Sequence, residues 1–204
     1  MTALRRLPWR ARYVWAAWLA SEARRLAVAA THRHATVRIA RPTRLGPGFA
    51  LWIPETGSFR AGPGCDFRRG FVAEVHGDGV LEIGAGSVFT SGALLQVSTS
   101  VRIGTRCSFG QSLLLVDGGH RFRDPDRNPL DQGYDFRPIE IGDGVMVLSK
   151  VTILASIGER AVIGANSVVT RPIPAFCLAV GAPARVLEYF GPPDRRPPEG
   201  EIQP

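Results

Sequence analysis

The sequence predicts an all-β fold, in which short strands wind into a solenoid of stacked coils behind one N-terminal helix. Three observations lead to this fold class. Aliphatic residues recur at six-residue steps, often followed by glycine or another small residue; the chain holds 23 Gly and 16 Pro among 204 residues; and a sustained helical pattern is confined to its start. Such a composition is typical of many short strands joined by turns.

The chain is expected to form one domain with a tail at each end. Its 204 residues, 45% of them hydrophobic, suffice for one well-buried core but not for two. We divide the sequence into a basic amphipathic helix over residues 1–35, a repeat region over 36–190 with a loop at about 117–138, and a Pro-rich, flexible tail over 191–204.

The first segment carries arginine clusters around an apolar stretch, and we expect its helix to begin after Pro8. A signal peptide is rejected, because three charged residues separate the apolar Tyr13–Ala20 from the small-residue stretch Ala27–Ala29. These are Glu22, Arg24 and Arg25. No apolar run reaches the length that spans a bilayer.

Two roles for this helix stay open. Packing on the body or on a sister subunit is the favoured one. The other is peripheral membrane contact, because interfacial helices combine aromatic and basic side chains. The residues concerned are Trp9, Trp15 and Trp18 beside Arg5, Arg6, Arg10 and Arg12. We therefore expect a cytoplasmic protein, with contact at the inner face of the membrane as the alternative.

The net charge of +7 comes almost wholly from arginine, since Lys150 is the only lysine. Such a surface attracts anions, but the arginines lack interleaved aromatic platforms or a reading helix, so nucleic acid is not expected as a partner. Cys65, Cys107 and Cys177 are odd in number and far apart. They predict buried small residues in a reducing cytoplasm rather than disulfides or a metal site.

The repeat is clearest from residue 81 onward. A six-residue period predicts one short strand and one corner, three times per coil, with the aliphatic residues stacked inward and the small residues allowing tight corners. Residues Val37–Val80 carry fainter versions, interpreted as degenerate first coils. Uneven spacing predicts a bulged corner between Leu95 and Ile103 and a clipped one between Ile153 and Ile157. The open ends need caps, for which the helix and the tail are candidates.

Two stretches, PIEIGD from Pro138 to Asp143 and IGANSVVTRPIPAFCLAVGAPARVL from Ile163 to Leu187, carry a family resemblance. Over roughly residues 81–190 the chain resembles the hexapeptide-repeat acyltransferase superfamily, particularly its sugar O-acetyltransferase branch. The resemblance implies a left-handed parallel β-helix, a homotrimer with active sites between subunits, and acetyl-CoA or another acyl-CoA as co-substrate.

His120 is the expected general base, because a hydroxyl is a weak nucleophile and histidine titrates near neutral pH. Of the four histidines, only His120 stands at the junction of a coil and a loop, in VDGGH, before the irregular segment Arg121–Arg137. Asp117 is a lesser candidate for orienting its ring. A corner aspartate that binds local backbone is the favoured interpretation of that residue.

The remaining site residues are implied by the resemblance. Ser149 would offer its backbone N–H to the thioester oxygen, stabilising the oxyanion, and Ala165 would contact the pantetheine arm. Arg171 and Arg185 match basic positions that reach coenzyme A phosphates, with solvated surface arginine as the alternative. Met146 and Leu148 depart from the family's WIG motif, and Leu148 adds bulk where the cofactor approaches.

We thus predict an acyltransferase that moves an acetyl or other acyl group from acyl-CoA to a hydroxyl of a sugar, glycan or glycolipid, without a metal or a covalent intermediate. An N-acyltransferase acting on an amino sugar, and a non-enzymatic trimeric scaffold that has lost coenzyme A binding, remain alternatives. A β-helix carbonic anhydrase is set aside, because it needs three zinc-binding histidines and the solenoid holds only His76 and His120.

Overall fold

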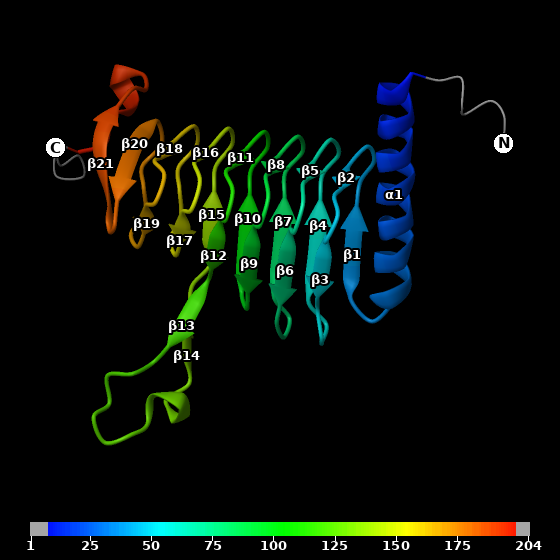
Figure 1. Ribbon diagram of the computed structural model, residues 1–204. Helices are drawn as coiled ribbons and strands as arrows, with labels where there is room; N and C mark the ends of the chain where they lie inside the picture. The colour runs from blue at the N-terminus through cyan, green and yellow to red at the C-terminus, as the bar shows by residue number, and fades with distance from the viewer. Residues whose placement is uncertain (1–7, 199–204) are drawn as a thin grey trace.

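The computed structural model describes residues 8–198. It shows a three-sided prism of strands, closed at one end by a helix and interrupted by one projecting hairpin (Figure 1).

The strands of the prism form three sheets, one on each side. Sheet A holds β1 (Thr36–Ile39), β4 (Ser58–Ala61), β7 (Val80–Ile83), β10 (Ser100–Ile103) and β15 (Ile139–Ile141). Sheet B holds β2 (Arg44–Leu45), β5 (Asp66–Phe67), β8 (Val88–Phe89), β11 (Ser108–Phe109), β16 (Met146–Val147), β18 (Val162–Ile163), β20 (Cys177–Gly181) and β21 (Ala184–Tyr189). Sheet C holds β3 (Ala50–Trp52), β6 (Val72–Val75), β9 (Leu94–Val97), β12 (Leu114–Val116), β17 (Thr152–Ile153) and β19 (Val168–Val169).

The chain runs through sheets A, B and C in turn, and equivalent strands of successive coils pair in parallel. The solenoid of stacked coils is therefore confirmed, and the faint early repeats form regular coils. The expected bulge after Leu95 is absent. Strands β9 and β10 are four residues long and each places two side chains inward, so the extra residues lengthen the strands. The coil beyond Ile153 is shortened as expected, and its sheet A strand is reduced to a bridge at Ile157.

The core tapers along the prism. In sheet B the inward column begins with Leu45, continues with three phenylalanines and then changes to smaller residues: Phe67, Phe89, Phe109, Val147, Ile163 and Ala179. The rings of Phe89 and Phe109 stack with centroids 4.5 Å apart. The number of residues in a coil decreases along with the size of the core side chains. Phe59 pairs with Leu81, 22 residues later, whereas Ile141 pairs with Ile157, 16 residues later. Wide coils enclose rings, and narrow coils enclose aliphatic side chains.

The glycines that follow the aliphatic residues serve a different purpose from the one expected. A Cβ atom on Gly84 would lie 2.5 Å from the carbonyl carbon of Gly104 in the next coil. The left-handed corner residue comes two positions later, as at Gly86 (φ 71°) and Arg106 (φ 55°). The small residue is therefore required by the close approach of two coils, and the tight turn is made by its second neighbour.

Two of the three cysteines belong to a column of buried corner donors. Each hydroxyl or thiol in this column donates to a glycine carbonyl of the following coil: Thr43 to Gly62, Cys65 to Gly84, Ser87 to Gly104 and Cys107 to Gly142. Burial raises the pKa of the Cys65 and Cys107 thiols. All three cysteines are buried and none forms a disulfide, which confirms the expected burial.

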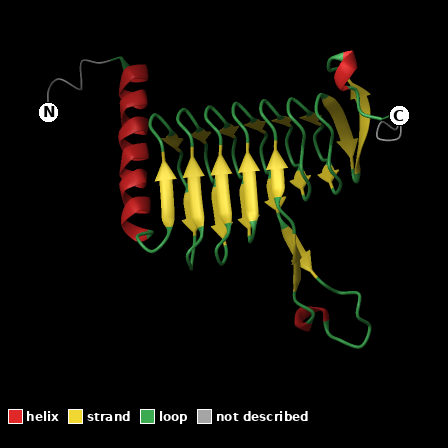
Figure 2. Ribbon diagram, turned by 180° about the vertical axis from the view of Figure 1, so that it is seen from behind, coloured by secondary structure: helices red, strands yellow, loops and turns green. Residues whose placement is uncertain are grey.

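Helix α1 (Trp9–Thr31) lies across the first coil and caps it (Figure 2). An open coil edge would expose unpaired backbone groups, and side chains from α1 and the turn after it bind them. The guanidinium of Arg25 donates to the carbonyls of Ile39 and Thr43 at 2.8 and 2.7 Å. The other contacts join Arg24 to Leu45 O, His32 to Leu51 O, His34 to Ile53 O, and Leu45 N to the Ser21 hydroxyl.

Helix α1 exposes several large apolar side chains. Its side chains Trp15, Trp18, Leu19 and Leu26 are more than half exposed, at 54, 53, 58 and 67%. Of the arginines expected beside them, Arg5 and Arg6 lie outside the described residues, and the side chains of Arg10 and Arg12 are likewise not among those described. Within residues 8–198, no helix is long and apolar enough to cross a membrane.

The far end of the prism is closed by the antiparallel pair β20–β21 and by the short helix η3 (Pro193–Arg195). The Arg195 guanidinium lies 4.8 Å from the ring centroid of Phe176 and pairs with Glu159 at 2.6 Å. The hydroxyl of Tyr189 donates to the carbonyl of Pro192. The last six residues of the predicted tail lie outside the described range.

Replacing Arg25 tests the cap. The Arg25→Ala substitution leaves two edge carbonyls without their donor and removes one of the two partners of the Glu22 carboxylate, so we expect the free energy of unfolding to fall by about 2 kcal/mol. Urea unfolding followed by circular dichroism measures the change. Arg38 lies exposed on β1, and Arg38→Ala is the control, with an expected change within about 0.5 kcal/mol. Equal losses in the two variants would contradict the capping role.

Candidate active site

A hairpin leaves the prism at the edge between sheets C and A. It consists of β13 (Gly118–His120) and β14 (Tyr134–Phe136), with the short helix η2 (Pro129–Asp131) between them (Figures 1 and 2). Before it, Val116 pairs with Gln96, and after it Ile139 pairs with Val101. The hairpin is therefore an insertion at one corner that leaves the coils in register.

His120 lies exposed at the base of this hairpin, opposite Tyr134. The two ring centroids are 4.3 Å apart, and Tyr134 in turn stacks on Phe136 at 5.5 Å and 9°. These three rings form one wall of a cleft whose other wall, on the prism, includes His76 and Gln96. No hydrogen bond joins the His120 ring to another described residue, so both ring nitrogens are open to a substrate.

Asp117 occupies the corner from which the hairpin departs. Its buried carboxylate accepts hydrogen bonds from the backbone N–H groups of Ser98 (2.9 Å) and Thr99 (2.6 Å) and from the Thr99 hydroxyl (2.9 Å). Among the described residues it makes no hydrogen bond to His120. This geometry corresponds to the favoured interpretation of Asp117, a corner aspartate that binds local backbone.

Gly118 determines how closely the hairpin strands meet. A Cβ atom there would overlap the ring of Phe136 and come within 2.8 Å of the Asp135 carbonyl oxygen. The absence of a side chain lets Phe136 cross over the base of β13. The first glycine of the VDGGH motif thus helps to set the position of His120 relative to the aromatic wall.

Ser149 and Ala165 lie at a different edge, between sheets B and C. The pairs Val147–Ile163 and Thr152–Val168 place the two residues one coil apart at equivalent corners. The Ser149 carbonyl accepts from Asn166 N–H at 3.0 Å, and the Ser149 hydroxyl donates to the Gln111 side chain. The Ser149 N–H donates to no described residue. It is available to an acceptor atom outside the prism.

Met146 and Leu148 stand beside this edge with their side chains about half exposed. Leu148 is in line with Gly110 of the preceding coil, where a Cβ atom would lie 2.5 Å from the Leu148 carbonyl carbon. At position 148 itself the structure accommodates a full side chain. The residue directly before the Ser149 N–H therefore carries an exposed isobutyl group.

Arg171 and Arg185 are exposed, and neither pairs with a described carboxylate. Arg171 follows β19 at the edge between sheets C and A, whereas Arg185 lies in β21 at the end of sheet B. Within one chain the expected site residues are therefore divided between two edges and, for Arg185, the end of sheet B. His120 and Ser149 do not meet.

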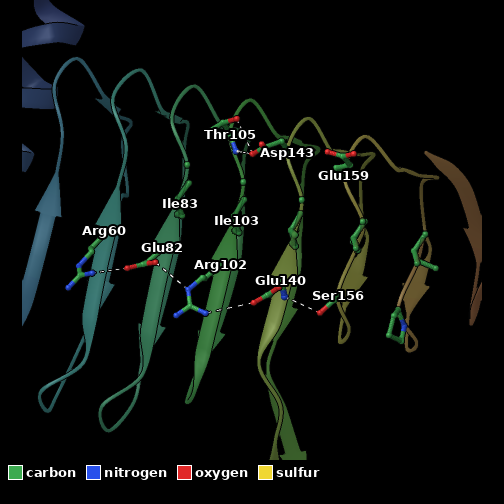
Figure 3. A pocket seen from close by; sticks show the side chains of 18 residues that line it. Arg60, Glu82, Ile83, Arg102, Ile103, Thr105, Glu140, Asp143, Ser156 and Glu159 are labelled. Carbon is green, nitrogen blue, oxygen red and sulfur yellow. Dashed lines mark hydrogen bonds and ion pairs between the residues drawn. The ribbon is translucent and has the colours of Figure 1, made fainter. Parts of the chain in front are cut away.

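A wide, shallow hollow over sheet A is lined by alternating charges (Figure 3). Glu82 pairs with Arg60 at 2.8 Å and with Arg102 at 3.4 Å, and Arg102 also approaches Glu140 at 3.8 Å. At its rim, hydrogen bonds from Thr105 lower the pKa of Asp143. This surface holds at least as many acidic as basic groups and does not favour phosphates.

Sequence reasoning missed the residues that surround His120. Tyr134 and Phe136 face it across the hairpin, and His76 and Gln96 reach the cleft from earlier coils. The alternation of aromatic residues in YDF after Gly133 was a usable strand signal. No group of three or more residues able to hold a metal ion occurs within the described part of the chain.

Comparison with curated proteins finds two informative relatives. The chain is 35% identical over 98 residues to the galactoside O-acetyltransferase of Escherichia coli, which covers 47% of each protein. It is 33% identical over 108 residues to the serine acetyltransferase of Haemophilus influenzae, which covers 52% of this chain and 36% of that one. The chain thus spans less than half the length of these relatives. No family model matches it.

Solved structures share the fold. The polySia specific acetyltransferase NeuO superposes with a TM-score of 0.66 at 19% identity, over 79% of this chain and 76% of that one. A hexapeptide-repeat containing acetyltransferase of Vibrio cholerae, complexed with acetyl coenzyme A, gives 0.56 at 23% identity, over 84% and 79%. The predicted left-handed parallel β-helix with an N-terminal helix and a short tail is confirmed. The chain is thus similar in sequence to curated acetyltransferases over about half of its length, and similar in fold to hexapeptide-repeat acetyltransferases.

Proposed function

We propose that the protein is an acyltransferase that moves an acetyl or other acyl group from acyl-CoA to a hydroxyl group of a sugar, glycan or glycolipid. The observation that carries the proposal is His120, an exposed imidazole without a described hydrogen bond at the base of an aromatic-walled cleft. The names of the relatives and the acetyl coenzyme A complex of a protein with this fold support the donor.

The chemistry requires one base and one oxyanion donor. His120 takes the proton of the acceptor hydroxyl as its oxygen attacks the thioester carbonyl. The Ser149 N–H, which has no described acceptor, stabilises the negative charge on the carbonyl oxygen. Collapse of the intermediate breaks the C–S bond, and protonated His120 returns the proton to the leaving thiolate. The proton taken from the acceptor hydroxyl thus ends on the thiol of coenzyme A. Because the acceptor oxygen attacks the thioester directly, the reaction needs no cysteine or serine nucleophile.

The division of these groups between two edges supports a homotrimer. The His120 edge of one subunit would face the Ser149 edge of its neighbour, and a threefold ring repeats that contact and closes. Ala165 would then line the pantetheine path, and Arg171 and Arg185, which pair with no described carboxylate, would bind phosphates of coenzyme A. One complete site would form at each of the three interfaces.

A non-enzymatic trimeric scaffold is the second candidate, and Leu148 favours it. Its side chain, on the residue before the proposed oxyanion donor, is exposed and would obstruct a donor substrate that approached from its side. Calorimetry with acetyl-CoA separates the two functions, because a scaffold does not bind the thioester. N-acylation of an amino sugar uses the same base and oxyanion donor, and a panel of amino and neutral sugars distinguishes the two acceptors.

Removing the proposed base tests the enzyme. We expect His120→Ala to lower kcat for acetyl-CoA cleavage in the presence of sugar acceptors by about 10²–10⁴-fold, while the affinity for acetyl-CoA is retained. Arg123→Ala, on the same hairpin, is the control and should keep its activity. Unchanged turnover in His120→Ala would rule out this base.

Mixing two inactive variants tests the shared site. His120→Ala lacks the base, and Ala165→Trp fills the proposed pantetheine path on the other edge. In randomly mixed trimers, roughly a quarter of the interfaces would combine an intact His120 edge from one subunit with an intact Ala165 edge from its neighbour. Co-expression should therefore restore about that fraction of the activity. A monomeric mass in light scattering, or no recovery on mixing, would contradict the trimer.

Helix α1 supports peripheral membrane contact of a cytoplasmic protein. Its outer face exposes Trp15, Trp18, Leu19 and Leu26, and its single acidic residue, Glu22, is already paired with Arg25 and Arg41. Aromatic and aliphatic side chains on a protein of net charge +7 suit an anionic bilayer surface.

Vesicle sedimentation measures this contact. We expect the protein to sediment with phosphatidylglycerol vesicles more strongly than with phosphatidylcholine vesicles, and Trp15→Ser combined with Leu19→Ser to remove most of the bound fraction. The control is Leu187→Ser, an exposed leucine at the other end of the prism. Equal sedimentation of both variants would show that α1 does not bind the bilayer.

A further inference from the structure

The outer face of sheet C carries a column of side chains that leads to the His120 cleft. Strand register places Trp52 beside Glu74, Glu74 beside Gln96, and Gln96 beside Val116. The chain then turns into the hairpin that carries His120. One face thus connects the first coil of the prism to the candidate base.

Contacts within this column fix the side chains but leave some of their polar atoms open. The Gln96 amide donates to Glu74 Oε2 at 2.8 Å, and His76 Nε2 lies 3.9 Å from the same oxygen. The His76 ring meets Trp52 edge to face, with centroids 4.9 Å apart. Gln96 Oε1 and Glu74 Oε1 have no partner among the described residues, so they can accept hydrogen bonds from ligand hydroxyls.

The facing wall is aromatic. Tyr134 and Phe136 are stacked and about half exposed, beside His120. Flat rings pack on the apolar C–H faces of a sugar ring, while amide and carboxylate oxygens bind its hydroxyls. At the far end of the column, the indole of Trp52 is 53% exposed and offers a second flat surface.

The column is longer than one sugar unit. Adjacent strands lie about 4.8 Å apart, so the three steps from Trp52 to Val116 span about 14 Å, more than a single pyranose ring. The corresponding face of sheet A differs, because its charged side chains pair mainly with one another. Sheet C is therefore the face that keeps acceptors and an aromatic surface open to a ligand.

We infer that the outer column of sheet C binds an oligosaccharide acceptor. The unit to be acylated lies in the cleft between His120 and Tyr134, the next units pass over Gln96 and Glu74, and a distal unit stacks on Trp52. This inference rests on the proposed function for the identity of the reacting unit. The binding path itself requires no acyl transfer.

Calorimetry without acyl-CoA tests the path. The probes are homooligosaccharides of galactose, glucose and N-acetylglucosamine, each from one to four units long. We expect the affinity for at least one series to rise with length, and Trp52→Ala to weaken binding of its four-unit member about tenfold. Gln96→Ala should weaken binding of the shorter members too. Phe122→Ala, which removes an exposed ring elsewhere on the hairpin, is the control and should bind like the parent protein.

The outcomes separate this inference from the proposed function. Binding that depends on length and on Trp52, without cleavage of acetyl-CoA, would support the path and overturn the enzyme. Transfer to monosaccharides with no gain from longer chains, or equal affinity of Trp52→Ala and Phe122→Ala for every probe, would overturn the path. Absence of binding by all three series would overturn it as well.

Discussion

The structure depends on one constraint, the direct stacking of each coil's backbone on the next. Hydrogen bonds such as Gly84 N–H to Ile103 O, at 2.7 Å, repeat from coil to coil, and the Gly84–Gly104 approach leaves no space for a Cβ atom. Because every coil fixes the position of its neighbour, side chains at equivalent positions form columns. This stacking produces the core, the column of corner hydroxyl and thiol donors, the alternating charges on sheet A and the column of side chains on sheet C.

Stacking also explains why the ends and the interior use different residues. Inside, each backbone group finds its partner in the adjacent coil, so hydrophobic side chains suffice to fill the prism. At the first coil that partner is missing, and long polar side chains such as Arg25 and His34 replace it. Two of the four histidines are thereby used as structural donors, which leaves His76 and His120 for the surface of the solenoid.

Much of the fold could be predicted from the sequence, because a six-residue period fixes which side chains face inward regardless of their identity. Phe89 and Leu95 lie in the core as that period requires. The reason for Gly84 could not be predicted, since a turn and a close approach both call for glycine. The cap could not be predicted either, because no local pattern distinguishes an arginine that binds edge carbonyls from one that is solvated.

The candidate site was predicted in part for the same reason. Corner positions follow the coil period, so Ser149 and Ala165 occupy equivalent corners one coil apart. Tyr134 approaches His120 only because a long insertion closes into a hairpin, and Gln96 only because a preceding coil lies beneath it. Contacts of this kind depend on pairing between distant segments, which the residues of either segment alone do not specify.

The hairpin has a consequence for how such a protein can change over time. It enters and leaves at one corner, between Val116 and Ile139, and the coils on both sides keep their register. Lengthening it costs only loop-closure entropy, about 0.6 kcal/mol for each doubling, and leaves the core unaltered. The hairpin is in this sense an exchangeable part: a lineage could change the aromatic wall beside His120 by replacing about twenty residues, while inheriting the rest of the prism unchanged.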